Sequence, residues 1–134
     1  MLVRRRHLAT LALAAMLASC GGGKDKADAE RTVREFVKAT NEHDADKFCG
    51  ELVTKDFLEQ TTGATGDEAE QQCKAQLESL KGVELQLVRI EKTTVNGDRA
   101  TVRARIATQG QTRDQVLRLQ KEDGRFKLAG GAGG

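Results

Sequence analysis

His43 and Asp44 are neighbouring residues whose side chains could carry out acid-base chemistry. A carboxylate that accepts a hydrogen bond from an imidazole raises its basicity, and such a pair can act as a general base. Residues adjacent in a chain rarely face each other, however, and Asp44 is of a type favoured as a helix N-cap. We favour the N-cap, and the chain contains no Tyr that could donate a proton. The sequence therefore predicts no catalytic residue and no cofactor.

The first residues of the chain have the pattern of an export signal. Arg4, Arg5 and Arg6 precede an uncharged apolar run of ten residues, 8–17. A membrane-spanning helix needs about 20 apolar residues, so this run is too short to cross a bilayer. A basic lead followed by a short apolar run is typical of a signal peptide that is removed from the mature protein.

The residues that close this segment resemble a known processing motif. Leu17-Ala18-Ser19-Cys20 is similar to the lipobox of bacterial lipoprotein signal peptides. The resemblance implies a signal peptide at 1–19, cleavage between Ser19 and Cys20, and a diacylglyceryl group on the Cys20 thiol. Two or three acyl chains, such as palmitate, hold a protein on a membrane for long times. The expected location is therefore the extracytoplasmic surface of the cell envelope. An ordinary signal peptide with a chance cysteine, or a buried N-terminal helix, is the alternative.

The mature chain expected from this cleavage has a different charge balance from the full sequence. Its 115 residues carry 19 Lys and Arg against 20 Asp and Glu, because three arginines leave with the signal peptide. Four Phe are its aromatic residues, and there is no Trp, so the stacking surfaces of single-stranded nucleic-acid binders are missing. We expect no nucleic-acid partner. Residues 20–26, with three consecutive glycines, are expected to form a flexible tether.

The remaining cysteines predict a disulfide bond. Lipidation of Cys20 leaves Cys49 and Cys73, an even number in an exported chain, where oxidising conditions favour disulfides. Their 24-position loop corresponds to about 3 kcal/mol of stabilisation in the chain-entropy model. Zinc is the alternative, but it needs four ligands, and the mature chain lacks C-x-x-C and H-x-x-x-H spacings and keeps one histidine. We predict no metal site.

Helical periodicity occupies the first half of the mature chain. The apolar spacing predicts a first helix to about Asn41, a second after the N-cap Asp44, and a short third helix capped by Thr54. A fourth helix should follow a capping arrangement at Thr65 or Asp67 and end at Gly82. Its expected inward residues are Ala69, Cys73, Leu77 and Leu80.

From Val83 onward the apolar period changes to two, which is typical of strands. The alternation changes parity at Val88, which indicates a β-bulge. Turns are expected at Asn96-Gly97, at 109–111 and at Asp123-Gly124, so the chain should form a four-stranded meander. The tail 130–134, GGAGG, has nothing to bury and is expected to be disordered. The predicted inward strand residues are Ala100, Val102, Ala104, Ile106, Leu117, Leu119, Phe126 and Leu128.

These elements predict an α+β fold, with N-terminal helices packed on a curved four-stranded antiparallel meander. The element order, the turn at 41–46, the Cys49 and Cys73 pair and the closing strand 123–128 resemble small nuclear transport factor 2-like lipoproteins of bacteria. The resemblance covers about 27–130 and implies a single cone-shaped domain at 27–129, often with a pocket. Some members of that superfamily are isomerases or dehydratases, and many are non-catalytic binding or accessory domains.

Small residues at the centre of the sheet could leave room for an apolar pocket between the sheet and the helices. The alternative, which we favour, is that Phe36, Phe48 or Phe57 fills this space. The expected lining of the pocket is Phe36, Ala100, Val102, Ala104, Leu117 and Phe126.

The opposite face of the sheet is predicted to carry basic residues that alternate with the core positions. Such a face could contact anionic headgroups or an acidic partner, at about 1 kcal/mol for each residue. Ordinary solvation of an exposed face is the alternative that we favour. The residues concerned are Arg103, Arg105, Arg118, Arg125 and Lys127.

Taken together, the sequence predicts a lipid-anchored extracytoplasmic binding or accessory domain without enzymatic activity. Its partner would be a protein or a small apolar ligand, in addition to the membrane that holds the lipid. A structural envelope component that docks on a larger assembly is one alternative. An enzyme of the isomerase or dehydratase kind is another, disfavoured because the predicted inward strand residues include no proton carrier.

Overall fold

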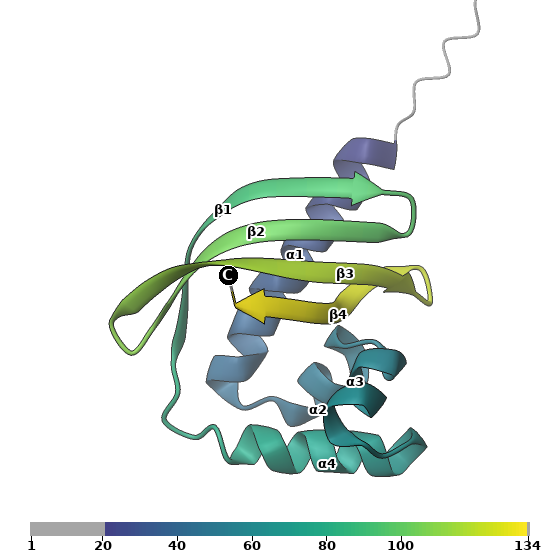
Figure 1. The fold of residues 1–134 in the computed structure, drawn as a ribbon, viewed down its shortest axis with the longest axis vertical. Helices are drawn as coiled ribbons and strands as arrows, with labels where there is room; N and C mark the ends of the chain where they lie inside the picture. Colours follow the sequence, from purple (N-terminus) through teal and green to yellow (C-terminus); the bar gives the residue numbers. More distant parts are fainter. Residues whose placement is uncertain (1–20, 134) are drawn as a thin grey trace, which may run out of the picture.

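The computed structural model of the protein describes residues 21–133, in which helices precede a single sheet. The predicted α+β class, with N-terminal helices packed on a curved antiparallel meander, is confirmed (Figure 1). The strands lie in the sheet in chain order. The helices are α1 (Gly21–Glu42), α2 (Ala45–Lys47), the π-helical segment η1 (Phe48–Leu52), α3 (Lys55–Thr62) and α4 (Gly66–Glu78). The strands are β1 (Leu85–Asn96), β2 (Arg99–Thr108), β3 (Gln111–Glu122) and β4 (Arg125–Gly133).

The core lies between α1 and the concave face of the sheet, and it continues beneath the shorter helices. α1 crosses the sheet, whereas α2, α3 and α4 gather at the end of the molecule away from the start of α1 (Figure 1). The core cluster draws on residues from Ala29 to Leu128, so the helices and the strands share one hydrophobic core. All eight predicted inward strand residues are buried: Ala100, Val102, Ala104, Ile106, Leu117, Leu119, Phe126 and Leu128.

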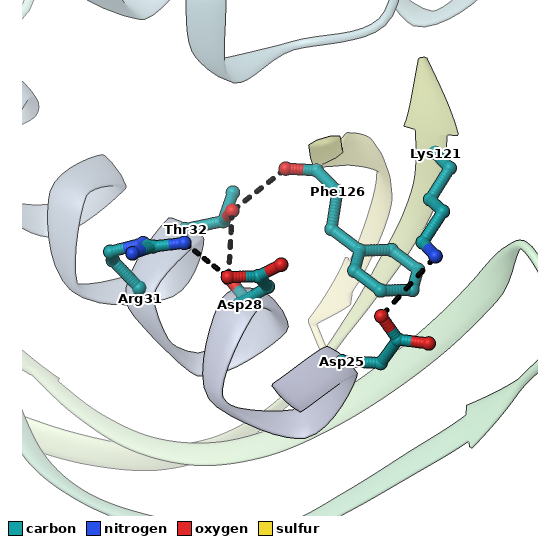
Figure 2. Close-up of polar contacts among 6 residues, drawn as sticks. All are labelled: Asp25, Asp28, Arg31, Thr32, Lys121 and Phe126. Carbon is teal, nitrogen blue, oxygen red and sulfur yellow. Dashed lines mark hydrogen bonds and ion pairs between the residues drawn. The ribbon is translucent and has the colours of Figure 1, made fainter. Parts of the chain in front are cut away.

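Two side chains fix α1 on the sheet. In the middle of the helix, Thr32 Oγ1 donates a hydrogen bond of 2.7 Å to the carbonyl of Phe126 in β4 (Figure 2). At its end, Asn41 Nδ2 donates to the Leu85 carbonyl and Asn41 Oδ1 accepts from the Leu85 amide, each at 2.7 Å. The first residue of β1 is therefore held by a side chain of α1.

Two predicted boundaries are corrected by the structure. Residues 21–26, expected to be a flexible tether, form the first turns of α1, where Asp25 pairs with Lys121 of β3 at 3.2 Å (Figure 2). The tail expected to be disordered continues β4 through Gly133, because the edge of β3 offers backbone groups that need partners. Within the described residues, regular structure thus extends beyond both predicted ends of the domain at 27–129. Ser19, Cys20 and the predicted signal peptide lie outside the described residues.

The short helices begin as predicted, but α4 ends earlier than expected. Thr54 Oγ1 accepts a hydrogen bond from the Phe57 amide and caps α3. Thr65 precedes α4, although its side chain forms no capping hydrogen bond. α4 ends at Glu78, and tighter hydrogen bonds to residues three positions back follow it, such as that from the Leu80 amide to the Leu77 carbonyl. This tightening turns Leu80 off the inward stripe and leaves it 43% exposed.

Bulges curve the sheet and shift its register. The bulge predicted at Val88 is confirmed by the register shift between Leu87 and Arg89. A second shift, at Glu91, and a third, at Ala129 of β4, were not predicted. The three strand connections are two-residue turns, at 97–98, 109–110 and 123–124, and the last two have positive φ at both positions, as type I′ turns require.

Candidate functional site

His43 and Asp44 form a turn rather than an acid-base pair. Asp44 Oδ1 accepts a hydrogen bond of 3.2 Å from the Lys47 amide, so the predicted N-cap is confirmed. His43 follows α1 in the left-handed region, with φ of 56°, and its Nε2 is buried with no hydrogen-bond partner in residues 21–133. The carboxylate of Asp44 therefore caps the start of α2 and does not pair with His43.

Cys49 of η1 and Cys73 of α4 are joined by a disulfide bond, which confirms the predicted pairing. Their Cα atoms are 5.9 Å apart, and both residues are buried in the core. The bond ties α4 to the segment that follows α1 and so fixes the helical end of the molecule. Within the described part of the chain, no cluster of three or more His, Cys, Asp or Glu residues is arranged to hold a metal.

The residues predicted to line an interior pocket lie in the core instead. Phe36 packs against Phe48, with ring centroids 5.4 Å apart, and both rings contact the buried cluster. Ala100 borders a cleft at the surface of the sheet. The other predicted lining residues of the strands are buried among core neighbours: Val102, Ala104, Leu117 and Phe126.

An apolar cleft of about 200 Å³ lies instead between η1, α3 and α4, next to the disulfide. An engineered cavity of about 150 Å³ binds benzene, whereas pockets for drug-sized ligands are about 300 Å³ or larger. The cleft thus has the size of one apolar side chain or ring. Sequence reasoning missed it because it placed Leu80 in the core. The residues that line it include Phe48, Phe57, Leu58, Cys73, Leu77 and Leu80.

A second cleft at the same end, of about 430 Å³, contains charged residues that pair with each other. Lys127 Nζ lies 3.2 Å from Glu122 Oε1 and 3.7 Å from Asp123 Oδ2. Glu122 Oε2 also accepts a hydrogen bond from the Lys55 amide. The side chain of Lys127 is 11% exposed, so its predicted place on an exposed basic face is wrong. It is buried because two carboxylates at the β3–β4 turn neutralise its charge.

The outer face of the sheet, which α1 does not cover, carries a larger basic group than predicted. Arg89 lies opposite Arg105 in the register, and Lys92 lies opposite Arg103. Sequence reasoning missed Lys92 because the unpredicted bulge at Glu91 turns it to the outer face. Arg89 already faces outward with the predicted bulge at Val88, but it was not counted among the basic residues. Arg125 lies apart, opposite Glu122 at the β3–β4 turn. We call the following set the basic face: Arg89, Lys92, Arg99, Arg103, Arg105 and Arg118.

Carboxylates neutralise part of the basic face. Asp114 Oδ1 lies 3.3 Å from Arg105 Nε, and Glu91 Oε1 lies 3.5 Å from Arg89. No ion pair within residues 21–133 involves the remaining four basic residues. These unpaired residues are Lys92, Arg99, Arg103 and Arg118.

Ion pairs on the helical surface perturb pKa values without creating a reactive group. The hydrogen bond from Lys74, together with its charge, lowers the pKa of the Asp46 carboxyl, and the two side chains link α2 to α4 at 2.9 Å. Lys81 lowers the pKa of Glu78 in the same way. Because both carboxylates are exposed and already paired, these shifts reflect surface contacts.

No protein-family model matches this chain, and no curated protein is similar to it in sequence. Three solved structures share part of its shape, each with a TM-score of 0.48. A de novo designed protein with a curved β-sheet is 22% identical and covers 77% of this chain and 95% of its own. An LEH-like epoxide hydrolase from M. tuberculosis is 18% identical, with coverages of 76% and 79%. A protein assigned as a ketosteroid isomerase from Kribbella flavida is 19% identical, with coverages of 78% and 77%. Similarity at this level does not assign an activity to the chain.

Proposed function

We propose that this protein is a lipid-anchored, non-enzymatic binding domain on the extracytoplasmic side of the cell envelope. The observation that carries the proposal is the disulfide between Cys49 and Cys73, because buried disulfides of this kind form and persist in oxidising compartments. The resemblance of 17–20 to a lipobox supports the anchor. None of the helices in residues 21–133 is long and apolar enough to cross a membrane.

The binding site in this proposal is the apolar cleft beside the disulfide. The helices that form the cleft lie at one end of the molecule, and α1 starts at the other end (Figure 1). In the sequence, Cys20 directly precedes the start of α1. A lipid on Cys20 would therefore leave the cleft facing away from the bilayer. Its size fits one apolar side chain of a partner protein, which is the usual form of an energetic anchor in an interface. The resemblance to nuclear transport factor 2-like lipoproteins, many of which bind without catalysing, agrees with this role.

The anchor is tested with the full-length chain expressed in a bacterium. We expect the wild-type protein in the membrane fraction, with the mass of a chain that begins at Cys20 and carries acyl groups. The Cys20→Ser variant should carry no acyl group and should leave that fraction. An unmodified wild-type chain of 134 residues in the cytosol would contradict the proposal.

The cleft is tested by cross-linking in intact cells with two matched substitutions. Leu80 in the cleft and Val88 on β1 are both large exposed apolar residues, at 43% and 49% exposure, so replacement of either by Asp should leave the fold intact. We expect Leu80→Asp to lose a cross-linked adduct that Val88→Asp retains. Equal yields of the adduct in both variants would contradict binding at the cleft.

A further inference from the structure

The basic face concentrates positive charge on one side of the sheet within the described residues. It carries six basic side chains on three adjacent strands, and two of them are paired with carboxylates. The mature chain expected after cleavage has nearly balanced charges, with 19 basic and 20 acidic residues. The positive charge on this face therefore reflects an uneven distribution over the surface rather than a basic protein. Such a distribution favours an anionic contact on this side of the molecule.

The structure also places the Arg99 end of this face close to the start of α1, the end that would be anchored. Within the described residues, α1 begins at Gly21, the residue that follows Cys20 in the sequence. Asp25 lies four residues further along, about 6 Å at the helical rise, and pairs with Lys121 of β3. The Lys121 amide donates to the carbonyl of Asp98, the residue before Arg99. Rigid contacts thus connect the anchored end to the Arg99 end of the basic face.

We propose that the basic face docks on the anionic headgroups of the bilayer that holds the lipid anchor. This inference rests on the lipid anchoring proposed above. A lipid on Cys20 keeps the face near a negatively charged surface, where potentials extend about 8–10 Å at physiological salt. Each basic residue near such a surface strengthens binding about fivefold. Association of this face with a second copy of the chain would instead oppose like charges.

The test uses the mature chain 20–134 with Cys20→Ser and an intact disulfide, so that no acyl chain contributes to binding. Sedimentation is measured with vesicles of phosphatidylcholine alone and with vesicles that also contain phosphatidylglycerol. We expect binding to the anionic vesicles, a steep decrease as salt is added, and no binding to phosphatidylcholine alone. Equal binding to both vesicle types, or binding that salt does not weaken, would overturn the proposal.

Two double variants with the same change of charge locate the contact. Arg103→Gln with Arg118→Gln removes two unpaired charges from the basic face, whereas Arg34→Gln with Lys38→Gln removes two exposed charges from α1. We expect the first pair to weaken vesicle binding about twentyfold and the second to change it less than twofold. All four positions are exposed, and circular dichroism verifies the fold of each variant. Equal losses in both double variants would show attraction by net charge and would overturn a docking face.

If the basic face binds an acidic protein or a second copy of the chain instead of a membrane, the binding experiments give different results. Binding to polyglutamate without binding to anionic vesicles would identify an acidic protein surface and overturn the proposal. A dimer in sedimentation equilibrium that the Arg103 and Arg118 substitutions abolish would identify a second copy and also overturn it. Because Cys20 is replaced in these experiments, their outcome is separate from lipidation of the full-length chain in cells. The basic face can therefore fail to bind vesicles in this assay even if the full-length chain is lipidated in cells. Likewise, the face can bind vesicles even if the full-length chain is not lipidated.

Discussion

Asn41 shows how a single side chain positions a strand. Its amide makes two hydrogen bonds of 2.7 Å with the backbone of Leu85, at the start of β1. Asn41→Ala removes both bonds, and we expect the free energy of unfolding in urea to fall by about 2 kcal/mol. Glu42→Ala, an exposed neighbour at the end of α1, should change it by less than about 0.5 kcal/mol. If the two variants are equally stable, the Asn41 contacts do not hold β1.

Glu122 and Lys127 form a pair whose members depend on each other. Glu122→Gln leaves the largely buried Lys127 ammonium near the exposed Asp123 alone, and we expect a loss of about 1–2 kcal/mol in unfolding free energy. Addition of Lys127→Met should recover most of this loss, because the uncompensated charge is then absent. A urea double-mutant cycle measures the coupling. Additive losses in the double variant would show that the pair is not coupled.

At the residue scale, the sequence predicts which side of the sheet a residue occupies better than it predicts the tertiary neighbours of that residue. Alternation placed Ala100, Val102 and Ala104 inward, and all three are buried. The same alternation placed Lys127 on an exposed face, but no local pattern shows that Glu122 and Asp123 of the preceding turn neutralise it. The burial of Lys127 depends on the tertiary position of β4 beside η1 and α3. For the same reason, the apolar cleft could not be predicted from helical spacing.

The disulfide is a covalent link between α4 and the segment that follows α1. Cys49→Ala with Cys73→Ala removes the 24-position cross-link from the unfolded chain, and we expect the unfolding free energy to fall by about 3 kcal/mol. Reduction of the wild-type protein should give a similar loss. Urea unfolding with and without reductant measures both. Equal stability with and without reductant would contradict a stabilising role for this bond.

The last residues of β4 provide a test of the corrected C-terminal boundary. Gly130 and Gly131 pair with Arg118 and Leu117 of β3, so truncation after Ala129 removes several backbone hydrogen bonds. We expect a loss of about 1–2 kcal/mol after allowance for the entropy of the glycines. Chain lengths that differ only beyond Ala129 are compared by thermal and urea unfolding. A disordered tail would give no difference between them.

At the element scale, local patterns predicted the bulges and helix ends only in part. The parity change predicted the bulge at Val88, because an inserted residue moves the apolar set to the other parity. The bulge at Glu91 changes the parity again between Ile90 and Val95, but the residues between these two are polar, so the apolar pattern does not locate the bulge. Gly82 has the left-handed conformation of a helix stop, at φ of 91°, yet α4 ends at Glu78. Tighter turns replace the helix between Glu78 and Gly82, and the spacing of apolar residues in the sequence does not predict them.

At the scale of the whole molecule, the proposed lipid anchor and the apolar cleft lie toward different ends of the fold. The start of α1 marks the anchored end, and the disulfide-linked helices with the apolar cleft form the other end (Figure 1). Because residues 21–26 are helical, the two ends of the molecule keep a defined direction relative to the proposed anchor. A flexible tether would let the domain reorient freely. A rigid connection instead restricts which surfaces can reach the bilayer.

This restriction predicts which surfaces of the lipidated protein contact lipid. The chain has no Trp or Tyr, so a single introduced Trp reports its surroundings without background. Thr101 is exposed on the outer face, opposite Arg118, and Lys38 is exposed on α1. In vesicles with brominated anionic lipids, we expect stronger quenching of Thr101→Trp fluorescence than of Lys38→Trp fluorescence. A flexible Gly-Ser insertion after Cys20 should weaken the quenching at Thr101, because the effective concentration of the sheet at the membrane falls with tether length. Equal quenching at both positions, unchanged by the insertion, would show that the anchored domain has no preferred orientation.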